Sequence, residues 1–166
     1  MPNWCEGILK LRGKKKNLIK FVENTLIRYI DNIETYKTEE IPLEASINEY
    51  GGFFVPASTK LNRDWIYFKD SKRMFVTSYI DWDFYEEKEN HIYIQQIDVK
   101  QAWNINSEYL LKIAQDYDLD IKIMAFEKGM QFTREIEIID GKIINDIKTE
   151  YGNEYKWKVY DFRLGG

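Results

Sequence analysis

The sequence predicts an α+β domain in which two helices pack on one face of an antiparallel sheet. Its 166 residues fit one domain over residues 1–166. Aromatic residues make up 16% of the chain, and such side chains suit the pleated, half-buried surface of a sheet. Two stretches with a helical repeat of apolar residues lie between segments whose apolar residues alternate. We therefore expect the order β-α-β-β-α-β, followed by further strands.

The first strand and the first helix are expected in residues 4–33. Apolar and charged side chains alternate over residues 4–12, which predicts a half-buried strand. Its apolar face consists of Cys5, Leu9 and Leu11. Apolar residues then recur every three or four positions over residues 14–33, which predicts an amphipathic helix with Asn17 as its N-cap. The apolar stripe of this helix consists of Leu18, Phe21, Val22, Leu26, Tyr29, Ile30 and Ile33.

The middle of the chain has weaker signals. Pro42, Gly51-Gly52 and Pro56 interrupt residues 34–72, which we expect to be an irregular insertion. Residues 73–80 are rich in β-forming side chains and predict a strand. The acidic residues 81–90 are expected to form a hairpin tip, from which the chain returns as a strand over residues 91–103.

The second helix and a C-terminal hairpin complete the predicted fold. Ser107 is expected to cap a helix that ends near Tyr117. Strands are expected over residues 120–126, 130–139 and 142–148. Asp140-Gly141 favours a type I′ turn between the last two of them. Residues 150–166 are expected to form a last strand or a docked tail. The β-α-β-β-α-β order is that of the ferredoxin-like fold, so the predicted fold class is a ferredoxin-like antiparallel sheet with an extra C-terminal hairpin.

Composition limits where the protein acts and what it binds. A single cysteine, Cys5, excludes an internal disulfide framework and a cysteine-ligated zinc site. No stretch approaches the roughly 18 apolar residues of a membrane span, and the start of the chain has no apolar signal segment. We therefore expect a protein of the cytoplasm. The net charge of −4 argues against strong binding of nucleic acid regardless of sequence, although residues 1–30 hold seven basic and two acidic side chains.

Four segments resemble one protein family. The opening Pro2-Asn3-Trp4-Cys5 resembles the N-terminus of the YubB-like proteins, and Ile41-Pro42-Leu43, residues 97–103 and residues 127–132 are similar to later segments of that family in the same order. Gly7 departs from the family, which has asparagine there. YubB-like proteins are uncharacterised proteins of phages, plasmids and other mobile elements, described as carrying a ferredoxin-like domain. The resemblance therefore implies a fold and a genomic setting but no mechanism.

The residue types that catalysis needs are scarce. His91 is the single histidine, so a histidine base or a histidine-ligated zinc ion would depend on it alone. Cys5 could act as a nucleophile only beside a base that lowered its pKa, whereas its place in an alternating strand indicates the core. Glycine-rich phosphate loops and CxxC pairs do not occur. We therefore expect no catalytic residue, no resident metal and no cofactor, and we favour a protein that is not an enzyme.

Two charged clusters are candidates for binding. The densest acidic segment predicts a patch that binds a basic partner surface, or else a solvated hairpin tip. Its candidate contact residues are Asp81, Trp82, Asp83, Glu86, Glu87 and Glu89. Asp81 and Asp83 share one face of a strand and could instead hold a divalent cation. Lys14, Lys15 and Lys16 precede Asn17, the predicted N-cap, and are candidates for phosphate contact at the helix N-terminus, or for a solvated basic turn.

Two functions follow as hypotheses. The first is an accessory protein of a phage or mobile element that binds a host protein or ribonucleoprotein complex. Such a protein would inhibit a bacterial defence system in the manner of an anti-CRISPR protein. The alternative is a nucleic-acid-binding module that uses the open sheet face and the basic N-terminal third. Neither hypothesis involves a membrane.

Overall fold

A computed structural model describes residues 3–32, 37–57, 64–84 and 90–166. Over these residues, the strands in chain order are β1 Trp4–Lys14, β2 Leu26–Asn32, β3 Lys37–Ile41, β4 Ser46–Ile47, β5 Phe53–Val55, β6 Asp64–Phe68, β7 Met74–Val76, β8 Ile80–Trp82, β9 Ile92–Ala102, β10 Asp120–Glu127, β11 Phe132–Ile139 and β12 Lys142–Glu150. The helices are α1 Lys15–Thr25, α2 Ser107–Tyr117, the 3-10 turn η1 Gly152–Glu154 and α3 Tyr155–Lys158.

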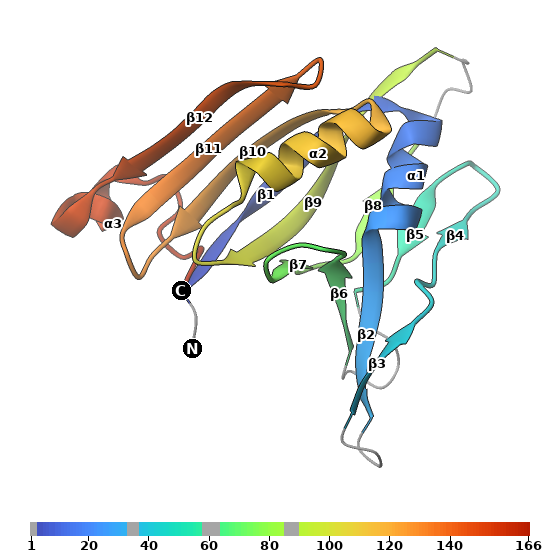
Figure 1. The fold of residues 1–166 in the computed structure, drawn as a ribbon, viewed down its shortest axis with the longest axis horizontal. Coiled ribbons are helices and arrows are strands. Elements are labelled where there is room, and N and C mark those ends of the chain that lie inside the picture. The colour runs from blue at the N-terminus through green and yellow to red at the C-terminus, as the bar shows by residue number, and fades with distance from the viewer. Residues whose placement is uncertain (1–2, 33–36, 58–63, 85–89) are drawn as a thin grey trace.

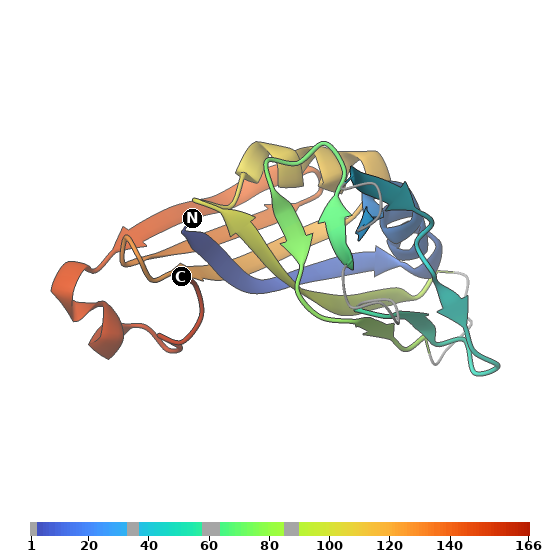
Figure 2. The same cartoon turned by 90° about the horizontal axis from the view of Figure 1, so that it is seen from below.

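The described strands form two antiparallel sheets. The main sheet has nine strands in the order β12-β11-β10-β1-β9-β7-β6-β2-β3, and the small sheet has three in the order β4-β5-β8. Figure 1 shows α1 and α2 lying across one face of the main sheet. In Figure 2 α2 lies on one side of the strands, and the C-terminal segment with α3 curls toward the other side. The helices therefore cover one face, which we call the helix face, and leave the opposite face of the central strands uncovered.

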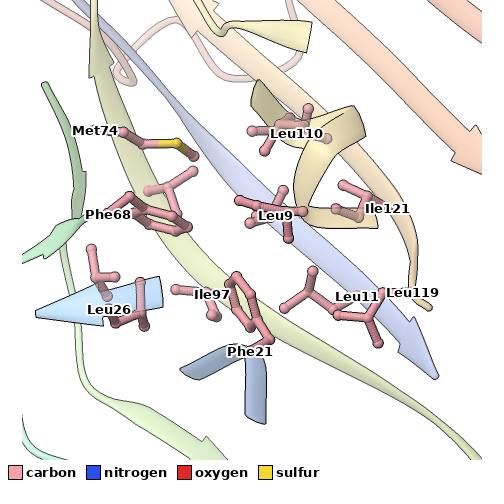
Figure 3. Packing of buried hydrophobic residues seen from close by; sticks show 14 of the residues in the cluster. Leu9, Leu11, Phe21, Leu26, Phe68, Met74, Ile97, Leu110, Leu119 and Ile121 are labelled. Carbon is pink, nitrogen blue, oxygen red and sulfur yellow. The ribbon is translucent and has the colours of Figure 1, made fainter. Parts of the chain in front are cut away.

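The predicted first strand is confirmed and lies in the middle of the main sheet. β1 pairs with β10 on one side and β9 on the other. Its residues Leu9 and Leu11 are fully buried, while Ile8, which points to the other face of the sheet, is exposed. Figure 3 shows Leu9 and Leu11 packed among Phe21 of α1 and Leu110 of α2. The alternation of the sequence thus matches the two faces of this strand.

The helix expected over residues 14–33 is wrong beyond Thr25. α1 ends there, and the chain continues directly into β2, in which Leu26 and Arg28 are buried and their neighbours are half-buried. Branched and aromatic side chains dominate this segment and favour a strand. Because the segment is only seven residues long, the spacing of its apolar residues also fits the stripe of a helix. Asn17 is not the N-cap, since Lys14 holds that position without a side-chain hydrogen bond.

The ferredoxin-like fold class is also wrong, because the structure is mostly β and its main sheet is much wider. The segment expected to be irregular supplies β3 and β6, which pair with β2 on its two sides. As a result β7 and β6 lie between β9 and β2 in the main sheet. β6 has the sequence Asp-Trp-Ile-Tyr-Phe, whose β-forming residues outweigh the effect of the breakers that precede it in the chain.

The C-terminal half follows the predicted order closely. α2 begins at Ser107, but its N-cap is Asn106, whose side chain accepts a hydrogen bond from the Tyr109 backbone N–H at 3.1 Å. Asp140 and Gly141 have φ angles of 49° and 65°, so the predicted turn with two positive φ angles between β11 and β12 is confirmed.

The last residues pack against the face of the main sheet opposite the helices, beside the start of β1. Tyr155 and Val159 form a second small core with Phe126 of β10. The backbones of Trp4 and Gly166 exchange two hydrogen bonds of 3.1 Å each. Of the two forms expected for residues 150–166, the structure has the docked tail, with α3 in place of a strand. Every helix in the described ranges is too short or too polar to cross a lipid bilayer.

Candidate binding surface

Five aromatic side chains from four strands form a continuous row on the main sheet. We call this set the aromatic row. It consists, in spatial order, of Trp4 (β1), Phe75 (β7), Tyr67 (β6), Tyr29 (β2) and Trp65 (β6). All five rings are half-buried, so each keeps part of its surface open to solvent.

Each ring of the aromatic row contacts the next. The centroid distances are 5.6 Å for Trp4–Phe75, 5.2 Å for Phe75–Tyr67, 6.0 Å for Tyr67–Tyr29 and 6.5 Å for Tyr29–Trp65. The first three pairs are edge-to-face and the last is tilted. Aromatic pairs in this distance range attract each other and hold their relative orientation. The aromatic row is therefore a preformed surface.

The aromatic row lies on the face of the main sheet opposite the helices. The residues that alternate with it, such as Leu26 in β2 and Ile66 in β6, are buried in the core on the helix face. Side chains of the central strands on the same face as the aromatic row are exposed, including Ile8 and Ile94. Since successive residues of a strand point to opposite faces, the rings face away from α1 and α2.

One end of the aromatic row carries positive charge. The Nζ atom of Lys100 lies 4.9 Å from the Trp4 ring centroid, and the guanidinium carbon of Arg73 lies 5.5 Å from it. Both distances fall within the range of a cation–π interaction. Lys100 is also the cross-strand neighbour of Phe75. An anionic group bound over these rings would therefore meet two cations.

Hydrogen bonds fix the turn that presents Arg73. The Tyr67 hydroxyl donates to the Ser71 carbonyl at 2.7 Å and accepts from the Arg73 backbone N–H at 3.2 Å. The buried Gln101 side chain donates to the Lys72 carbonyl at 3.2 Å. Arg73 has a φ of 56°, a conformation that the surrounding contacts must hold for a residue other than glycine. The cation is thus positioned by the same tyrosine that forms the centre of the aromatic row.

Carboxylates lie at the borders of the aromatic row. Glu6 is the cross-strand neighbour of Lys100, and its carboxylate accepts a hydrogen bond from the Gly165 N–H at 3.0 Å. Glu40 of β3 lies opposite Tyr29 at the far end. The end near Trp4 therefore holds two cations and one carboxylate, and the end near Tyr29 has an acidic border.

The predicted acidic segment lies on and after β8, and the structure separates its members. Asp81 and Asp83 are exposed, whereas Trp82 is 1% exposed and its indole N–H donates to the Gln96 carbonyl at 3.0 Å. The Trp82 ring packs 5.9 Å from Phe53 in the core, so it is not available to a partner. Glu86, Glu87 and Glu89 fall outside the described residues.

The exposed carboxylates of β8 lie beside a second pair of rings. Phe54 of β5 is the cross-strand neighbour of Asp81, and its ring centroid lies 6.1 Å from that of Tyr79. Phe54 is 40% and Tyr79 is 58% exposed. We call Phe54, Tyr79, Asp81 and Asp83 the acidic patch. No group of three or more potential metal ligands occurs among the residues that the structure describes, and Asp81 with Asp83 alone would make an incomplete cation site.

Lys14, Lys15 and Lys16 lie where β1 passes into α1, away from the aromatic row. Lys14 ends β1, and Lys15 begins α1 with its Nζ 5.2 Å from the Phe84 ring centroid. Lys14 and Lys16 line a hollow that Asp116 and Asp118 also line. Because these carboxylates share the hollow, it is a poor site for phosphate. The expected phosphate contact of Lys14, Lys15 and Lys16 therefore receives no support from the geometry.

Cys5, the candidate nucleophile, and His91, the candidate base, lie apart. Cys5 is fully buried, and burial raises the pKa of its thiol to about 12. The predicted core position of Cys5 is thus confirmed. His91 lies beside Tyr93, with 4.5 Å between the ring centroids.

Cys5 is expected to resist thiol reagents in the folded protein. Since the thiolate is the reactive form and burial disfavours it, labelling with Ellman's reagent at pH 8 should be negligible until the chain unfolds. The reaction should then reach one thiol per chain in denaturant. Rapid labelling under native conditions would contradict the buried position of Cys5.

Comparisons with known proteins found no relative of this chain. No family model matches it, and no curated protein or solved structure gives a significant match.

The aromatic row was missed in the sequence because its members were assigned to the wrong elements. Tyr29 belonged to the predicted helix, and Trp65 and Tyr67 to the segment expected to be irregular. The alternation of Trp65 and Tyr67 in a five-residue run of β-formers was the available signal. A strand prediction there would have placed both rings on one face.

Proposed function

We propose that this protein is an accessory protein of a phage or another mobile element that acts by binding a macromolecule in the cytoplasm of a bacterial host. The observation that carries the proposal is the aromatic row. Large aromatic side chains that gather on one face and keep part of their surface open to solvent are typical of binding surfaces, because they bury large areas at a low cost in conformational entropy. The resemblance of the opening segment to the YubB-like proteins supports the mobile-element setting.

The proposal is tested by capture from a bacterial lysate with the tagged protein. The wild type is compared with a variant that carries Phe75→Leu and Trp65→Leu, which keeps both side chains apolar but removes two rings. We expect the wild type to retain a defined protein, ribonucleoprotein or nucleic acid, and the variant to lose most of it. A matched control is Trp157→Leu, which removes an exposed ring of α3 outside both candidate surfaces. Capture that stays at background, or that is unchanged by the two substitutions, would contradict the proposal.

Inhibition of a bacterial defence system is the biological outcome we propose for this binding. The expected result is that expression of the chain in a host with an active defence system raises the plating efficiency of a targeted phage. The same double variant should lose this effect. If both proteins leave plating unchanged across representative defence systems, the anti-defence role is wrong while macromolecule binding stands on its own test.

A second candidate function is binding of a basic protein surface by the acidic patch. Two exposed rings beside two exposed carboxylates favour it, since rings supply contact area and carboxylates select arginine or lysine. Asp81→Lys with Asp83→Lys reverses the local charge. Loss of a captured protein in this variant, with capture intact in the variant that carries Phe75→Leu and Trp65→Leu, would assign the contact to the acidic patch.

A further inference from the structure

We infer that the aromatic row binds single-stranded nucleic acid, with unpaired bases stacked on its rings and phosphates held at the Trp4 end. The inference rests on the proposed function, since it names the partner class for the same surface. The shared chemistry of the ligand is a flexible chain of flat bases and anionic phosphates, which RNA and DNA both provide.

The spacing of the rings suits a series of bases. Phe75, Tyr67 and Tyr29 lie on three different strands, with centroids 5.2 Å and 6.0 Å apart. Adjacent strands of a sheet are about 4.8 Å apart, so an extended chain that crosses the strands passes one ring after another. Sheet-based proteins that bind single strands use rings in this way, and each stacked base contributes about 1–3 kcal/mol.

Charge complementarity favours this occupant over an uncharged one. Lys100 and Arg73 both lie within 5.5 Å of the Trp4 centroid, where the ligand's phosphates would lie next to a stacked base. Arg73 is exposed, and its backbone is held by the Tyr67 hydroxyl. A neutral polysaccharide would also stack on aromatic rings, but it would gain nothing from two cations.

The open geometry selects unpaired bases over a duplex. The rings are half-buried in a sheet, so they offer only part of their surface and cannot reach between the stacked pairs of a double helix. The net charge of −4 opposes long-range attraction to any nucleic acid. Binding should therefore depend on local contacts with the rings, and it should show little preference for base sequence.

The test is fluorescence anisotropy with fluorescein-labelled oligo(dT) and oligo(U), each of about 12 nucleotides, and with a duplex of the same length at low salt. We expect both single strands to bind the wild type and the duplex to bind more weakly. Phe75→Leu should weaken binding by about tenfold, since it removes one stacking platform. Phe75→Tyr keeps a ring and should bind like the wild type, which separates stacking from any loss of folding.

The cations are tested by salt dependence. Lys100→Ala should reduce the slope of log affinity against log salt by roughly 0.7, the value for one phosphate contact on a single strand. Lys122→Ala is the matched control, because Lys122 lies on the same face but pairs with Glu137 at 3.2 Å. This control should leave the slope unchanged.

Failure of the inference is distinguishable from failure of the proposed function. If neither single strand binds at micromolar protein, or if the duplex binds equally well, the nucleic-acid inference is overturned. Equal losses in Phe75→Tyr and Phe75→Leu would overturn it as well. If the nucleic-acid test fails but the variant with Phe75→Leu and Trp65→Leu still loses a protein or polysaccharide that the wild type captures from lysate, the aromatic row binds another class of macromolecule.

Discussion

Replacing Arg28 with methionine is expected to lower the free energy of unfolding by about 3–5 kcal/mol. Arg28 of β2 and Asp64 of β6 form an ion pair in which both side chains are 0% exposed. The same guanidinium donates to the backbone carbonyl of Pro56, and at 3.4 Å to that of Ala57, both just after β5. Arg28 thus joins two strands of the main sheet to the end of a strand of the small sheet. Its removal leaves a buried carboxylate without the cation that neutralises it.

Urea unfolding followed by tryptophan fluorescence measures this loss. The matched control is Arg12→Met, since Arg12 pairs with Asp120 at 2.6 Å but the side chains are 47% and 25% exposed. Exposed pairs contribute about 1 kcal/mol or less, so this variant should remain close to the wild type. The double variant Arg28→Met with Asp64→Leu should recover part of the stability, because it buries no unpaired charge. Equal losses for Arg28→Met and Arg12→Met would contradict the buried pair.

Replacing Gly7 with alanine is expected to cost about 3 kcal/mol, near the upper end of the usual cost of overpacking a core. Gly7 lies in the middle of β1, opposite Ala125 of β10. A Cβ atom there would lie 2.2 Å from the Met124 carbonyl oxygen and 2.7 Å from the Ala125 Cα. Both atoms belong to the backbone of β10, so the two central strands would have to move apart.

Gly13→Ala is the matched control on the same strand and the same face. Its Cβ would meet the Leu119 Cδ2 atom at 2.4 Å, and the other atoms lie at least 3.5 Å away. A leucine side chain can change its rotamer, so we expect a cost of about 1 kcal/mol. Thermal unfolding by circular dichroism compares the two variants. A Gly7→Ala protein as stable as Gly13→Ala would show that β1 and β10 are less closely packed than described.

Elements with strong local signals were predictable from the sequence. The strict alternation of β1, the Asp140-Gly141 turn and the helical stripe of α2 each depend on residues within a few positions, and each matches the structure. The end of α1 was not predictable in this way. Over Leu26–Asn32 a helical stripe and a half-buried strand require similar apolar positions, and pairing with β6 and β3 decides between them.

The candidate site was predicted less well than the fold. Asp81 and Asp83 are exposed as expected, but Trp82 between them is buried, because alternate residues of β8 point to opposite faces. The rings of the aromatic row come from β1, β2, β6 and β7, whose order in the sheet does not follow the order of the chain. A surface assembled from such strands leaves no contiguous motif in the sequence.

The sequence by itself determined the strands and turns that local alternation and turn chemistry encode, the scarcity of catalytic side chains, and the core position of Cys5. Only the tertiary structure decided that β6 and β7 lie between β2 and β9, and that Arg28 is buried with Asp64. It alone brought Trp4 next to Phe75, 71 positions later in the chain. The physical reason is that side-chain periodicity specifies which face of a strand is buried, whereas the choice of neighbouring strand depends on long-range packing and hydrogen bonding.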